Sequence, residues 1–78
     1  MKSLYIVYMK HYLITKIGAE LDKRFLQKRM VGSGWTSSHF AHKFLSLGSA
    51  QLEASEHENV RVLWVDDSHP AKWGEVNN

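Results

Sequence analysis

Cysteine is absent from the chain, which has 78 residues and a single proline. Without cysteine there are no disulfides, no thiol nucleophile and no thiolate metal ligands. The longest apolar run, residues 4–9, stops at Lys10 and His11 and falls far short of the roughly 20 residues that span a membrane. It is also too short for the core of a signal peptide. We therefore expect a cytoplasmic protein that makes no use of a membrane.

The composition is that of an ordinary globular protein, because the hydrophobic fraction of 44% is too high for a disordered chain. A chain of this length folds as one domain and buries only about 60–65% of the surface of its unfolded state. We expect a single domain over residues 1–78, with residues 71–78 forming a loosely held tail.

Charge is distributed unevenly along the chain. Residues 1–50 hold eight basic and two acidic side chains, a net charge of +6, whereas residues 51–78 hold two basic and six acidic ones, a net charge of −4. This asymmetry indicates an acidic partner for the first half or attraction between the two halves within the fold. Two solvated faces of opposite sign are the simpler interpretation.

The strongest secondary-structure signal is a strand over residues 60–65. This run is rich in β-branched residues, and the acidic pair Asp66 and Asp67 follows it, before Pro70 excludes further pairing. Residues 4–9 are rich in strand formers and are its expected partner. Residues 10–16 fit either a continuation of that strand or the start of a helix, because no turn residue separates Met9 from Tyr12.

Two helices are predicted between these strands. Apolar side chains at Ile14, Ile17, Leu21 and Phe25 share one arc at 100° per residue, which predicts a helix over residues 17–30 that ends at Gly32 and Gly34. After potential N-caps at residues 36–38, a second apolar arc comprises Phe40, Ala41, Phe44, Leu45, Leu47, Gly48 and Leu52. Gly48 leaves open whether this second helix is continuous or divided.

The predicted fold class is therefore α+β, a single small domain in the order β-α-α-β, with a small sheet covered on one face by two amphipathic helices. The main alternative is an all-helical structure for residues 5–30. The predicted core comprises Ile6, Tyr8, Ile14, Ile17, Leu21, Phe25, Phe40, Phe44, Leu47, Leu52, Val62 and Trp64.

Candidate catalytic and metal sets are incomplete. His39 and His42 have the spacing of two metal ligands on one helix face, but a third ligand would have to come from elsewhere, such as His57 or Glu53. His42 and Ser46 are four residues apart, yet neither an orienting carboxylate nor an oxyanion hole accompanies them. We expect no enzyme activity, no metal and no cofactor.

Residues 62–70 resemble the first strand of a response-regulator receiver domain, with Asp66 and Asp67 as its paired acids. In that family the pair helps to bind Mg²⁺ near a phospho-accepting aspartate on a later strand. Only eight residues follow Pro70, which leaves no room for the later strands. We therefore interpret the pair as the end of a strand or an acidic contact patch.

The function predicted from the sequence is that of a small non-catalytic protein-binding domain, an inhibitor or adaptor that occupies a surface of a larger, acidic protein. The expected aromatic and basic contacts are Lys16, Lys23, Arg24, Lys28, Arg29 and Trp35. The alternative is a nucleic-acid-binding module that uses the basic helix over residues 16–29, with Tyr8, Tyr12 and Trp35 as stacking aromatics.

Overall fold

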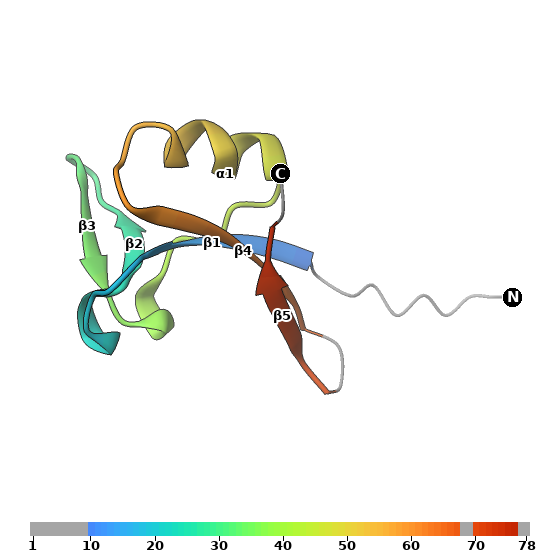
Figure 1. Cartoon of the computed structure of the whole chain (residues 1–78). Coiled ribbons are helices and arrows are strands. Elements are labelled where there is room, and N and C mark those ends of the chain that lie inside the picture. The colour runs from blue at the N-terminus through green and yellow to red at the C-terminus, as the bar shows by residue number, and fades with distance from the viewer. Residues whose placement is uncertain (1–9, 68–69, 77–78) are drawn as a thin grey trace, which may run out of the picture.

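The computed structural model describes residues 10–67 and 70–76, which form a five-stranded antiparallel sheet with one α-helix (Figure 1). The strand order is β3-β2-β1-β4-β5. The strands are β1 (Lys10–Lys16), β2 (Phe25–Lys28), β3 (Ser33–Thr36), β4 (Val60–Asp66) and β5 (Lys72–Glu75). The helical elements are the 3₁₀ turns η1 (Leu21–Lys23) and η2 (Ser38–Phe40) and the helix α1 (Leu47–Ala54). The α+β class is confirmed, but the order β-α-α-β is wrong because one helix, not two, accompanies a larger sheet.

The centre of the sheet is the long pair of β1 and β4. Seven residue pairs are in register, from Lys10 opposite Asp66 to Lys16 opposite Val60. The strand predicted over residues 60–65 is confirmed, and residues 10–16 are a strand rather than the start of a helix. Its expected partner, residues 4–9, lies outside the described residues together with Ile6 and Tyr8. β5, which pairs with β4, is not predicted from the sequence.

The helix predicted over residues 17–30 is wrong, because the chain turns back at Gly18. Its positive φ of 82° is a conformation that glycine adopts without steric cost. The backbone N–H of Lys16 then donates to the Arg24 carbonyl at 2.7 Å. The Arg24 guanidinium donates to the Ala19 carbonyl at 2.9 and 2.7 Å, which closes the loop. Gly32, with φ of 75°, makes the next turn, between β2 and β3.

β2 explains why the helical spacing was misleading. Phe25 and Leu26 are adjacent, so their side chains leave the strand on opposite faces of the sheet. Leu26 is fully buried on the α1 side, whereas Phe25 is half-buried on the other side. Ile17 and Leu21, which share the predicted arc, are exposed instead of belonging to the core.

The second predicted helix forms only over its C-terminal half. The Ser46 hydroxyl accepts a hydrogen bond from the Ser49 backbone N–H at 3.1 Å and so caps α1. Before this cap the chain is extended, and Phe44 exchanges two backbone hydrogen bonds with Tyr12 at 2.8 and 2.9 Å. Gly48 lies in the first turn of α1 without dividing it.

The core lies between α1 and one face of the sheet. Its buried members are Ile14, Leu26, Phe44 and Ala50, and around them pack Tyr12, Trp35, Ala54, Val60 and Val62. Among the predicted core residues, the burial of Ile14 and Phe44 is confirmed. The exposed side chains of Ile17, Leu21, Phe40 and Leu52 contradict the prediction, because the two long helices that would bury them do not form.

Two isoleucines provide a matched test of this core. Ile14→Ala should lower the free energy of unfolding by about 2–5 kcal/mol, because it leaves a cavity at a fully buried site. Ile17→Ala, at a side chain that is 48% exposed, should cost less than about 1 kcal/mol. Urea unfolding of both variants checks the difference, and equal losses would contradict this arrangement.

Candidate functional site

The sheet face opposite α1 carries a group of apolar side chains among polar ones. Side chains alternate between the two faces of a strand, and partners across an antiparallel pair lie on the same face. Because Ile14 and Val62 pack towards α1, their neighbours Leu13 and Leu63 are directed to the other face. The same rule adds Val65 and its partner Trp73, and Phe25 opposite Thr15.

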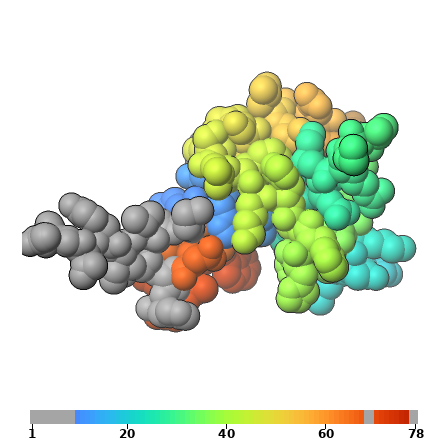
Figure 2. Space-filling view, turned by 180° about the vertical axis from the view of Figure 1, so that it is seen from behind, coloured from blue at the N-terminus to red at the C-terminus, as the bar shows by residue number. Residues whose placement is uncertain are grey.

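This face is hollowed into two adjoining cavities of about 560 and 310 Å³. They share three lining residues, Phe25, Leu63 and Trp73. Figure 2 shows the hollow between β5, in red, and the yellow-green segment that contains η2. We call this hollow the apolar groove, and its apolar lining consists of Leu13, Ile17, Leu21, Phe25, Leu63, Val65 and Trp73.

Trp73 stands on one wall of the apolar groove and is 70% exposed. Its strand, β5, pairs with β4, and Gly74, the partner of Trp64, has no side chain. A Cβ atom at position 74 would lie 3.0 Å from three atoms of the Trp64 ring. The absence of this atom lets β5 and the Trp64 ring approach closely on the face opposite Trp73.

One end of the apolar groove is basic. Lys16, Arg24 and Arg61 line it there, together with a single carboxylate, Glu75. The Arg61 Nε lies 3.3 Å from Glu75 Oε1, so this pair neutralises itself. Arg24 supplies the positive charge that remains, because the Lys16 Nζ lies 5.2 Å from the centroid of the Trp35 ring on the α1 side. One of the side chains predicted to bind a partner, Arg24, therefore lies beside the apolar side chains, although not on a helix.

The other predicted contacts are dispersed. Lys23 and Trp35 line a separate cavity of about 570 Å³, to which Lys16 also contributes. Arg29 follows β2, in the turn that leads to β3, and its guanidinium lies against Gly34 of β3. The single basic face expected along residues 16–29 does not exist, because turns and strands direct these side chains to different sides.

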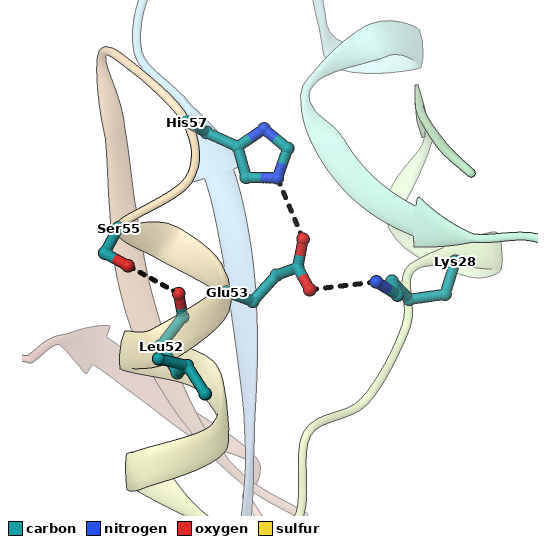
Figure 3. A network of polar contacts seen from close by, with 5 residues as sticks. All are labelled: Lys28, Leu52, Glu53, Ser55 and His57. Carbon is teal, nitrogen blue, oxygen red and sulfur yellow. Dashed lines mark hydrogen bonds and ion pairs between the residues drawn. The ribbon is translucent and has the colours of Figure 1, made fainter.

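Lys28 belongs to a clasp between the sheet and the helix (Figure 3). Its Nζ lies 2.8 Å from Glu53 Oε1, and His57 Nε2 lies 3.0 Å from Glu53 Oε2. The Glu53 side chain is only 15% exposed. Hydrogen bonds from Lys28 and His57 lower the pKa of Glu53, against the opposing effect of burial. Lys28 therefore stabilises the fold in an ion pair that offsets its charge.

The sequence contained a signal for the apolar groove that periodicity alone did not reveal. Val62, Leu63, Trp64 and Val65 are consecutive, and a strand without alternation is typical of burial on both faces. No comparable signal marks Trp73, which lies in the segment expected to be a tail. Within residues 10–67 and 70–76, no group of three His, Asp or Glu side chains is arranged to hold a metal ion.

Comparisons with known proteins give no relatives for this arrangement. No protein-family model matches the chain, and no significant match was found among curated proteins or solved structures. None of the helices in the part of the chain that the structure describes is long and apolar enough to cross a membrane.

The clasp predicts an acid-sensitive contribution to stability. Glu53→Gln should lower the free energy of unfolding by about 1–2 kcal/mol at pH 7, since it weakens hydrogen bonds to a charged group. Because the pKa of Glu53 is lowered in the folded state, this contribution is present above pH 4.5 and is lost as the pH falls through the lowered pKa. Unfolding curves of both proteins should therefore converge in acid. Glu56→Gln, at an exposed position on the same segment, is the control.

Proposed function

We propose that this protein is a non-catalytic protein-binding domain, an inhibitor or adaptor whose apolar groove receives an apolar segment of a larger protein. The observation that carries the proposal is the apolar groove, in which the exposed side chains of Ile17, Leu21 and Trp73 surround the buried Leu13. Contiguous exposed apolar surface of this kind is typical of interaction sites. Trp73 and Leu21, both 70% exposed, are the anchors we assign to it.

The basic end of the apolar groove defines the chemistry of the partner. Arg24 retains positive charge there, since Arg61 is paired with Glu75 and the Lys16 Nζ lies over the Trp35 ring. A complementary segment carries large apolar side chains, with aspartate or glutamate next to them. The acidic partner expected from the charge distribution is thus retained, with a different set of contacts.

Apolar burial and ion pairs in the proposed interface differ in the binding free energy that they contribute. Burying the exposed part of a tryptophan contributes roughly 3 kcal/mol at about 25 cal/mol per Å². An exposed ion pair contributes about 0–1 kcal/mol. Affinity should therefore depend mainly on the apolar groove, whereas Arg24 should influence the association rate and the orientation of the segment.

A random library of twelve-residue peptides, selected on the intact chain, is the probe for this function. We expect selected peptides that combine large apolar residues with nearby acids and that perturb the indole signal of Trp73 in NMR spectra. Peptides that bind without affecting this signal, or that are selected for basic residues, would overturn the proposal.

Two equally exposed leucines, one inside and one outside the apolar groove, provide a matched test of where the peptide binds. Leu21→Ser, in the groove, should weaken binding of a selected peptide about tenfold, which corresponds to a contact worth somewhat more than 1 kcal/mol. Leu52→Ser, on α1 and also 70% exposed, should leave binding unchanged. Isothermal titration calorimetry measures both, and thermal unfolding verifies that both variants fold. A loss of similar size for Leu52→Ser would place the interface elsewhere.

The basic end can be tested through rates. Arg24→Gln should slow association and reduce its dependence on salt, because a charge beside the apolar groove steers an acidic peptide. Arg24→Lys should retain fast association because it keeps the charge, although it loses the paired hydrogen bonds to the Ala19 carbonyl. Arg29→Gln, in the turn between β2 and β3, is the control. Stopped-flow fluorescence gives the rates, and identical values for all variants would exclude steering by Arg24.

A further inference from the structure

A second cavity lies on the other side of the sheet from the apolar groove. Trp35 is opposite Leu26 in the pair of β2 and β3, so its ring lies on the α1 side. Beside it is the cavity of about 570 Å³, within the range of about 300–1,000 Å³ that is usual for small-molecule sites. We call this cavity the basic groove, and it is lined by Lys16, Gly18, Ala19, Glu20, Lys23 and Trp35.

Trp35 provides a fixed aromatic surface in the basic groove. Its ring packs against the core and meets His57 edge-on, with the centroids 5.5 Å apart and an angle of 80° between the planes. The Lys16 Nζ lies over the ring, 5.2 Å from its centroid. This ammonium is carried by a flexible, exposed side chain, so a planar ligand can take its place at the cost of a rotamer change and of this exposed cation–π contact, about 0.5–1 kcal/mol.

The two lysines of the basic groove keep their charge available. Within the described residues, neither Lys16 nor Lys23 forms an ion pair, in contrast to Lys28, which is bound to Glu53. Glu20 is the single carboxylate in the lining. The groove therefore combines an excess of positive charge with an aromatic ring, a combination typical of sites that bind the bases and phosphates of single-stranded nucleic acids.

We propose that the basic groove binds a nucleotide, with its base on the Trp35 ring and its phosphate at Lys16 and Lys23. A planar ring alone would not use the lysines, and a phosphate alone would not use Trp35. The nucleotide is either free or one unit of a single strand. This site does not depend on the protein-binding function, because its aromatic surface and Lys23 lie outside the apolar groove.

The experiment is a titration of the full chain with AMP and, separately, with a twelve-residue oligothymidylate, followed by ¹H–¹⁵N NMR. Trp35→Phe identifies the indole signal of Trp35 among the three tryptophans. We expect this signal to move on titration and that of Trp73 to remain unchanged. A response to AMP identifies a free nucleotide as sufficient, whereas a response to the oligothymidylate alone identifies a unit within a strand. No movement of the Trp35 signal with either probe would overturn the proposal.

Two lysine variants distinguish binding at the basic groove from nonspecific attraction of the nucleotide to a positively charged surface. Lys23→Gln should weaken binding about three- to tenfold and reduce the slope of log affinity against log salt by roughly one for each phosphate that the lysine neutralises. Lys43→Gln, at another exposed lysine, should change neither quantity. Equal effects of both changes would overturn the proposal.

The contribution of the base is tested at Trp35 itself. Trp35→Leu should weaken binding at least about tenfold because the base can no longer stack, whereas Trp35→Phe should retain most of the affinity. Dispersed NMR spectra verify that each variant is folded. Tripolyphosphate, which has charge but no base, should compete weakly, and competition as strong as that of the nucleotide would overturn the proposal. Leu21→Ser should leave nucleotide binding intact, so the two functions can fail separately.

Discussion

The register between β1 and β4 determines the two faces of this molecule. A shift of β4 by one residue would direct Leu63 towards α1 and move Val62 to the opposite face, while β1 kept its orientation. With seven residue pairs, this ladder is the longest in the described sheet, and both neighbouring strands are positioned by it. The core and the apolar groove are therefore two results of one pairing.

The sheet requires more cover than its helix supplies. β1 and β4 carry apolar side chains on both faces, but α1 has only eight residues and packs on one of them. η1 and η2 are single 3₁₀ turns, and their apolar residues Leu21 and Phe40 remain largely exposed. Ile17, Leu21 and Trp73 therefore remain exposed around the buried Leu13, which is the physical basis for proposing a binding domain.

The predictable part of the fold was the part decided by local sequence. The run of β-branched residues in β4, bounded by acids and Pro70, identified that strand without tertiary information. The apolar spacing of residues 14–25 did not identify the structure there, because a hairpin and a helix can present the same spacing of Ile14, Ile17, Leu21 and Phe25. Gly18 decided between them through a positive φ, yet glycine within a helical pattern carries only a modest penalty and was not a sufficient signal.

The candidate sites were predictable only in their chemistry. Charge and aromatic content indicated Lys16, Lys23, Arg24 and Trp35, but which of them meet depends on turns between distant strands. Glu53 is a further example, since its contact with Lys28 joins residues 25 positions apart and removes that lysine from the binding surface. Trp73 lines the apolar groove because β5 pairs with β4. The sequence of residues 72–75 gives no indication of this pairing.

Lys16 is the last residue of β1 and lines both grooves, with its Nζ over the Trp35 ring on the side of the basic groove. A single ammonium group cannot neutralise an anion on each side of the chain at the same time. An acidic segment in the apolar groove and a phosphate in the basic groove would therefore compete for it, although their binding sites do not otherwise overlap. Thermodynamic linkage requires this antagonism to be mutual, so that each ligand lowers the affinity for the other by the same factor. If both proposed ligands bind, the side chain at the end of β1 couples the two sites.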